Sequence, residues 1–128
     1  MNYLLDTNAW VAFFEDSRDL SDRAAQIMES DSGRCWISVV SVWEAAIKVG
    51  LGKLKLDYDL ERELPRLVEQ NGFQLLGLEV EDAAGTRGLE MIHKDPFDRV
   101  LVCQARRRGC TILSRDPVFE KYGLKRIW

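Results

Sequence analysis

The sequence of 128 residues is poor in the side chains that mark several common classes of enzyme. It has one histidine, His93, so a Ser-His or Cys-His hydrolase would depend on that single side chain meeting its nucleophile through the fold. The three cysteines form no C-x-x-C pair, which argues against a zinc or dithiol centre and favours reduced core residues. No phosphate-loop motif is present, since "VGLGKL" lacks the required spacing and closes a predicted helix.

The sequence also lacks a long apolar run and a large excess of either charge. The opening "MNYLLDTNAW" has no basic residues at its start and reaches the charged Asp6 early, so we expect neither a secretion signal nor a membrane span. The expected location is the cytoplasm. The formal net charge is −3, whereas domains that hold nucleic acid by positive potential alone usually carry surplus Lys and Arg. This charge is compatible with an acidic pocket within a slightly basic surface.

What the sequence does contain is a regular alternation of short apolar segments and amphipathic ones. The 46% of hydrophobic residues, with no linker or repeat, fits one globular domain over residues 1–128. Strands are predicted at residues 3–5, 34–40, 73–78, 110–113 and 124–128. Helices are predicted at residues 7–16, 21–29, 41–50, 59–71, 81–88, 95–109 and 116–123. This alternation predicts an α/β fold with a parallel sheet covered by helices.

Four acidic residues stand where such a sheet would gather them. Asp6 directly follows the first strand and Asp116 lies just past the fourth, so both are expected at the carboxyl edge of the sheet, where ligands bind. Glu44 and Asp98 lie in the first turns of predicted helices, whose amino ends can point toward the same edge. We therefore expect four carboxylates to converge.

Each of these acids also has a local interpretation as a residue that caps a helix or favours its dipole. In that interpretation the caps are Asp6, Asp95 and Asp116, the dipole-favouring residue is Asp98, and Ser41 and Glu44 in "SVWE" form a capping box. The single histidine is interpreted in the same way, as a surface or capping residue. Independent caps have no reason to collect at one edge of a sheet, so their coincidence of place favours a functional site.

Carboxylates that converge in this way repel one another, so they must share protons or bind a divalent cation. Oxygen-only ligands favour Mg²⁺ or Mn²⁺. Such ions lower the pKa of a bound water and hold the charge that builds on a leaving oxygen. The expected chemistry is therefore that of a nuclease. The alternative is a noncatalytic α/β interaction module whose acids are only helix caps, and metal binding separates the two.

The same segments resemble the PIN-domain ribonucleases, and within them the VapC toxins of bacterial toxin–antitoxin pairs. The resemblance spans nearly the whole chain, in "LLDTNAW", in "ISVVSVWEAAIK" followed by "GKL", in "HKDPFDRVLVCQA", and in "ILSRDPVFEKYG" followed by "IW". It implies that the catalytic and metal-binding quartet is Asp6, Glu44, Asp98 and Asp116, with Asp95 as a helix cap beside it. It also implies that Thr7, Asn8 and Ser114 shape the pocket.

The resemblance has consequences for the fold, the cofactor and the partners. It implies a three-layer α/β/α domain with about five strands in a mostly parallel sheet, a Mg²⁺ or Mn²⁺ cofactor and a homodimer. The implied substrate is structured RNA such as transfer or ribosomal RNA. A cognate antitoxin would silence the toxin by laying a segment across the acidic groove.

Two features of the surface bear on these partners. Subtracting the four acids from the net charge of −3 leaves +1, so RNA must be steered by local patches. Cations near the motifs are possible phosphate contacts, with solvated surface as the alternative: Lys48, Lys53, Arg99 and Arg115. Most aromatic residues are expected in the core, but four tryptophans, Trp43 among them, leave room for an aromatic patch where a second subunit or an antitoxin helix would dock.

Overall fold

Strands and helices alternate throughout residues 1–128 in the computed structural model, as the sequence pattern predicts. The strands are β1 (Asn2–Leu5), β2 (Arg34–Ser38), β3 (Gln74–Leu76), β4 (Thr111–Leu113) and β5 (Arg126–Ile127). The helices are α1 (Thr7–Phe14), α2 (Asp22–Glu29), α3 (Val39–Gly50), α4 (Leu60–Gln70), α5 (Val80–Gly85) and α6 (Pro96–Arg108), with 3-10 helices η1 (Thr86–Gly88) and η2 (Pro117–Tyr122). None of these helices combines the length and the apolar character that a membrane crossing needs.

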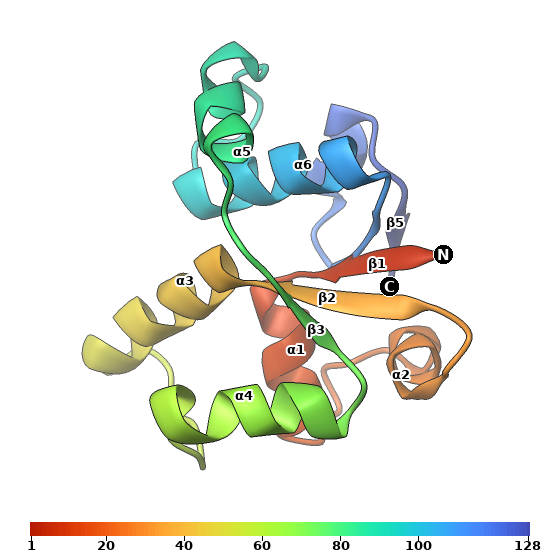
Figure 1. Cartoon of the computed structure of the whole chain (residues 1–128), viewed down its shortest axis with the longest axis vertical. Coiled ribbons are helices and arrows are strands. Elements are labelled where there is room, and N and C mark those ends of the chain that lie inside the picture. The colour runs from red at the N-terminus through yellow and green to blue at the C-terminus, as the bar shows by residue number, and fades with distance from the viewer.

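The five strands form one parallel sheet in the order β3-β2-β1-β4-β5 (Figure 1). In β1, Leu4 is paired with Trp36 of β2 on one side and with Ile112 of β4 on the other. Strands β2 and β3 follow β1 on one side of it, and the later strands β4 and β5 lie on its other side. The strand order therefore reverses between β1 and β4. The carboxyl ends of these two strands adjoin at this point, where open α/β sheets bind their ligands.

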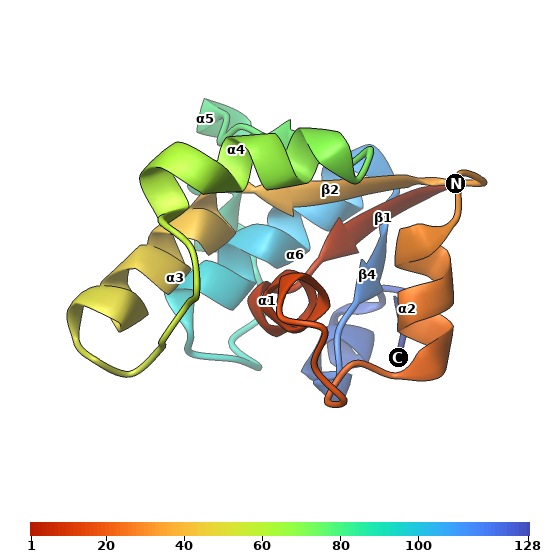
Figure 2. The same cartoon turned by 90° about the horizontal axis from the view of Figure 1, so that it is seen from below.

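Helices cover both faces of the sheet, which confirms the expected three-layer α/β/α fold (Figures 1 and 2). Helices α5 and α6 lie on one side of the sheet in Figure 1, and α1, α2 and α4 lie on the other. Because side chains of a strand alternate between faces, Leu4 packs in a core cluster with α6 whereas Leu5 packs in a second cluster with α1 and α4. Both leucines are fully buried.

One helix begins earlier than the sequence predicts. The β-branched residues of "ISVV" are typical of a strand, but β2 ends at Ser38, and the Ser38 hydroxyl accepts a hydrogen bond from the Val40 backbone at 3.1 Å. Ser38 is therefore the N-cap of α3, and the expected capping box of Ser41 and Glu44 is wrong. Ser41 instead lies inside α3 and is fully buried.

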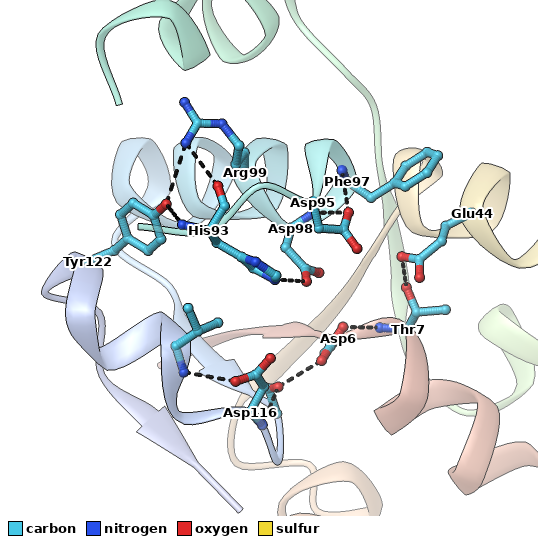
Figure 3. A network of polar contacts seen from close by, with 12 residues as sticks. Asp6, Thr7, Glu44, His93, Asp95, Phe97, Asp98, Arg99, Asp116 and Tyr122 are labelled. Atoms are coloured by element: carbon cyan, nitrogen blue, oxygen red, sulfur yellow. Dashed lines mark hydrogen bonds and ion pairs between the residues drawn. The ribbon is translucent and has the colours of Figure 1, made fainter. Parts of the chain in front are cut away.

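The helix that carries "DPFDR" agrees with its predicted signals at both ends. Asp95 is the N-cap of α6, and its carboxylate accepts hydrogen bonds from the backbones of Phe97 and Asp98. Pro96 occupies the first helical position, where its missing N–H costs nothing. Gly109 ends the helix in the left-handed conformation, with φ of 63°. These caps direct the first turn of α6 toward the carboxyl edge of the sheet (Figure 3).

Candidate active site

An acidic pocket of about 450 Å³ lies at the point where the strand order reverses. Apart from Pro117, every residue that lines it is polar or charged. Its carboxylates come from the end of β1, from α3, from the start of α6 and from the segment after β4: Asp6, Glu44, Asp95, Asp98 and Asp116. The structure thus brings the four acids that were predicted from the sequence into one pocket, together with the cap residue Asp95 (Figure 3). Two cations, Lys48 and Arg115, also line the pocket, so its charge is negative when all groups are ionised.

Asp6 is at once a helix cap and a pocket residue. Its Oδ1 accepts a hydrogen bond from the Thr7 backbone at 2.7 Å, which caps α1. Its Oδ2 accepts one from the Ser114 hydroxyl, also at 2.7 Å. Burial raises the pKa of Asp6 above its usual range, and the nearby charges of Glu44 and Asp116 add to this, although the two hydrogen bonds act in the opposite direction. The capping and site interpretations therefore do not exclude each other.

Glu44 is held by groups on both sides of its carboxylate. Oε1 accepts a hydrogen bond from the Thr7 hydroxyl at 2.9 Å, and Oε2 pairs with the Lys48 ammonium at 2.7 Å. The Thr7 hydroxyl is also hydrogen-bonded to the Ser41 hydroxyl. The Ser41 hydroxyl in turn accepts a hydrogen bond from the Trp10 indole N–H at 2.8 Å. All three residues of this hydrogen-bond network, Thr7, Trp10 and Ser41, are buried. The network therefore fixes the side chain of Glu44 from inside the protein.

Asp98 contacts the single histidine of the chain. His93 Nε2 lies 2.8 Å from Asp98 Oδ2 (Figure 3). Burial, together with the charges of Asp6 and Asp95, raises the pKa of Asp98 to about 7, although the hydrogen bond to His93 lowers it. This contact was not predicted from the sequence, in which His93 was interpreted as a surface or capping residue. The signal available was its position in "HKDPFD", two residues before Asp95, the cap of α6.

The loop that carries His93 is held from two directions. The backbone N–H of His93 donates a hydrogen bond to the Tyr122 hydroxyl at 2.9 Å. The Arg99 guanidinium donates to four backbone carbonyl groups between residues 86 and 93, including that of His93 itself at 3.2 Å. These hydrogen bonds fix the loop that places the His93 imidazole against Asp98.

Asp116 completes the pocket from the segment after β4. It is exposed, and its Oδ1 accepts a hydrogen bond from the Val118 backbone at 2.9 Å, which caps η2. Ligating atoms of His93, Asp98 and Asp116 all lie within 4.8 Å of one another. Carboxylate oxygens suit a divalent cation, and His93 is placed to orient Asp98 through its hydrogen bond. A bound cation would favour the ionised form of Asp98, which burial and the neighbouring acids disfavour. The residues present therefore fit a divalent metal.

The predicted cations differ in where they lie. Lys48 and Arg115 line the acidic pocket, although Lys48 pairs with Glu44. Arg99 does not line it, because its guanidinium is directed to the carbonyl groups of the loop before α6. Lys53 is exposed in the turn after α3 and lies outside the lining as well. Among the predicted pocket-shaping residues, Thr7 and Ser114 are buried behind the acids, whereas Asn8 is exposed and lines the pocket.

Comparison with known proteins adds a family match and a set of similar folds. A family model described as PIN domain matches residues 3–125. A structure of VapBC2 from Rickettsia felis bound to a promoter DNA fragment is similar with a TM-score of 0.72 and 16% identity, covering 99% of this chain and 98% of that chain. DNA-bound VapBC from Salmonella typhimurium gives a TM-score of 0.66 and 18% identity, covering 99% and 97% of the two chains. A toxin–antitoxin complex from Klebsiella pneumoniae gives a TM-score of 0.61 and 19% identity, covering 90% of this chain and 87% of that chain.

At these low identities the similarity to solved structures establishes a shared fold. The comparison with curated proteins finds no significant match.

Proposed function

The chain belongs to the PIN-domain family, and from this premise we propose that it is a divalent-metal-dependent endoribonuclease that hydrolyses phosphodiester bonds of structured RNA. The observation that carries the proposal is the gathering of carboxylates from four separate segments into one pocket whose lining is polar or charged apart from Pro117. A pocket of this kind is costly to maintain without a cation, because burial and mutual repulsion disfavour the ionised forms of its acids.

Each pocket residue has a role in the proposed site. Asp6, Glu44, Asp98 and Asp116 would hold Mg²⁺ or Mn²⁺, which when bound supplies an acidified water and compensates charge on the leaving oxygen. Thr7 and Ser114 hold the carboxylates of Glu44 and Asp6 in place through hydrogen bonds.

The cations at the pocket would contact the substrate backbone. Arg115 and Lys48 border the acids and are suited to the phosphates that flank the bond to be cut. Lys48 would do so while it also neutralises Glu44. Arg99 has no such role in this proposal, because it does not line the pocket and its guanidinium donates to backbone carbonyl groups of the loop before α6.

We extend the proposal to a role as the toxin of a toxin–antitoxin pair, with transfer or ribosomal RNA as the substrate. The support is the fold shared over nearly the whole chain with structures that include a toxin–antitoxin complex. A cognate antitoxin would block the enzyme by laying a segment across the acidic pocket. The proposed location is the cytoplasm, where the reducing conditions suit three buried cysteines that form no disulfide. We also propose that residues 1–128 form one PIN-like domain.

A homodimer is part of the same proposal. Helix α3 exposes Val39, Trp43 and Ile47, which are four residues apart and therefore form one apolar stripe. Trp43 is 60% exposed. Its ring meets that of Phe97 edge to face at a centroid distance of 5.2 Å, which extends the stripe to α6. Contiguous exposed apolar side chains of this kind favour contact with a second copy of the chain.

The alternative remains a noncatalytic interaction module. Asp6, Asp95 and Asp116 do cap helices, so capping gives these three acids a structural reason to be present. It gives none for Glu44, which caps no helix and is buried against the pocket. Metal binding decides between the two functions.

The test combines metal binding with RNA cleavage. We expect Mg²⁺ or Mn²⁺ to raise the melting temperature of the wild-type protein and Asp98→Asn to abolish this increase. The wild type should cut structured RNA with a divalent ion and stop when a chelator is added, while Asp6→Asn stays folded but inactive. Equal melting shifts in wild type and Asp98→Asn, or cleavage by Asp6→Asn, would contradict the proposed site.

A further inference from the structure

A second hollow, of about 320 Å³, adjoins the acidic pocket. Asn8 and Arg115 line both, so the two hollows share a border. Beyond this border, Val11 and Ala12 of α1 contribute an apolar wall and Trp128 contributes an aromatic ring. The chemistry proposed for the acids makes no use of this second hollow.

The polar groups of the second hollow suit a ligand that donates hydrogen bonds. Glu15 and Asp19 are exposed carboxylates in its lining, and Ser17 adds a hydroxyl. The only cation in the lining is Arg115, whose Nη2 donates to the Asp19 carbonyl oxygen at 2.8 Å. The lining therefore has two carboxylates and one cation, Arg115, which is already hydrogen-bonded to a backbone carbonyl group. Such a hollow repels a phosphate and accepts a neutral group that carries N–H donors.

Its aromatic and cationic groups are arranged for stacking. The Arg115 guanidinium lies over the Trp128 ring, with Cζ 5.7 Å from the ring centroid. Proteins that read single-stranded RNA stack unpaired bases on aromatic rings or on guanidinium planes and hydrogen-bond the base edges. A flat ring inserted here would meet the Arg115–Trp128 pair and the apolar wall of α1 while its edge reached Glu15 and Asp19.

We propose that this hollow receives an unpaired nucleobase next to the bond that is cut in the acidic pocket, and that it prefers guanine. The inference rests on the proposed ribonuclease function. The nucleotide would cross the shared border at Asn8 and Arg115, with its phosphate on the side of the acids. Guanine is preferred because its N1–H and N2 amino group offer adjacent donors to one carboxylate. Uracil has one ring N–H between two carbonyl oxygens, which a carboxylate repels.

The first test measures base binding without cleavage. Guanosine and uridine 5′-monophosphates carry the same phosphate, so a difference between them reports the base. We expect guanosine monophosphate to shift the indole N–H resonance of Trp128 saturably in a ¹⁵N-labelled full-length protein, and uridine monophosphate to bind about tenfold more weakly. The resonance is assigned with Trp128→Phe.

Variants place the effect in the hollow. Glu15→Gln combined with Asp19→Asn keeps the shape of two exposed side chains, and should remove the preference for guanosine monophosphate. The matched control, Asp57→Asn with Glu61→Gln, changes two exposed acids outside both hollows and should bind as the wild type does. Equal binding of the two nucleotides, or an unchanged preference in the first double variant, overturns the proposed base site.

A cleavage experiment separates this inference from the proposed function. With a randomised RNA and Mg²⁺, the wild type should show a guanine preference beside the cut, and the Glu15→Gln, Asp19→Asn variant should still cut but without it. Cleavage with the same preference in both proteins overturns the base site and leaves the nuclease standing. Guanosine monophosphate binding as expected but no RNA cleavage by the wild type overturns the nuclease instead.

Discussion

At the scale of single residues, the site is dominated by carboxylates whose ionised forms are disfavoured. Asp98 shows this most clearly, because burial and the charges of Asp6 and Asp95 raise its pKa to about 7. A divalent cation competes with that proton for the same oxygen atoms. The affinity of the site for metal is therefore tied to pH.

The first prediction concerns pH and Asp98. Its pKa rises on folding from an ordinary 3.8 to about 7, so the folded protein binds more protons than the unfolded chain between these values. The free energy of unfolding of the metal-free protein should then fall as the pH rises from about 4 to about 7, by on the order of 3 kcal/mol. The apparent affinity for Mn²⁺ should increase over the upper part of the same range.

Urea denaturation at several pH values, with and without Mn²⁺, measures both effects. Asp98→Asn serves as the control, because residue 98 then cannot titrate and the pH dependence should become smaller, with a part remaining from Asp6, whose pKa is also raised. A metal-free stability that increases toward pH 7 would show that Asp98 ionises freely in the folded protein.

The second prediction concerns His93, which orients Asp98 from outside the quartet. The hydrogen bond of 2.8 Å holds one oxygen of Asp98, so its loss should leave the carboxylate free to rotate. We expect His93→Ala to weaken Mn²⁺ binding about tenfold or more, as is typical when a partner of a metal ligand is removed. His93→Gln, which can still donate a hydrogen bond, should recover part of the affinity in calorimetric titrations. Lys94→Ala, an exposed neighbour, should have no effect.

At the scale of secondary-structure elements, α3 serves the interior and the surface with different faces. One face carries Ser41, Glu44 and Ala45, which are buried against α1 and the pocket. Another face carries the exposed stripe of Val39, Trp43 and Ile47. Because Glu44 follows Trp43 directly, a partner that covers the stripe would lie close to the acidic pocket.

The third prediction tests this stripe as a dimer contact. Trp43→Asp places a charge in the proposed interface, and desolvating an unpaired charge is costly, so we expect a shift from dimer to monomer in sedimentation equilibrium. The melting temperature extrapolated to low protein concentration should change little, because Trp43 is mostly exposed within one chain. Val49→Asp also adds a charge to an exposed position of α3 but lies off the stripe, and should stay dimeric. A wild-type protein that is monomeric at all concentrations contradicts the proposed dimer.

At the scale of the whole molecule, the three consecutive arginines at the end of α6 form ion pairs within the chain. The arginines that end α6 pair with acids: Arg106 with Glu90, and Arg107 and Arg108 with Asp82. Those pairs fix α6 to the segment around α5 instead of forming a basic patch. With a net charge of −3, the molecule as a whole does not attract a polyanion.

The fourth prediction follows from this distribution. If Lys48 and Arg115 are the main phosphate contacts, the affinity for RNA should depend weakly on salt, with a slope of log affinity against log salt near −1.4 for two contacts to single-stranded phosphates. Binding of the inactive Asp6→Asn variant to RNA, measured at fixed Mg²⁺ and increasing KCl, gives this slope. Arg115→Gln should make it shallower by about half. A slope steeper than about −3 would mean that further cations take part.

Local signals in the sequence were enough to predict most of the elements and the caps of α6, because these features depend on neighbours in the chain, although the cap of α3 was placed at Ser41 instead of Ser38. The signals around α6 illustrate this: Asp95, Pro96 and Gly109 act through hydrogen bonds and backbone angles within a few residues, and both ends of the helix were predicted correctly. The alternation of strands and helices likewise sufficed for a parallel sheet, and therefore for placing Asp6 and Asp116 at one edge.

Which side chains meet across elements depended on how the elements pack in the fold. The contact of His93 with Asp98 depends on a loop held by Arg99 and Tyr122, and Ser41 became a buried partner of Thr7 because α3 begins at its cap, Ser38. Contacts of this kind depend on the packing of segments that are distant in the chain, and no local spacing encodes which partner a side chain will reach.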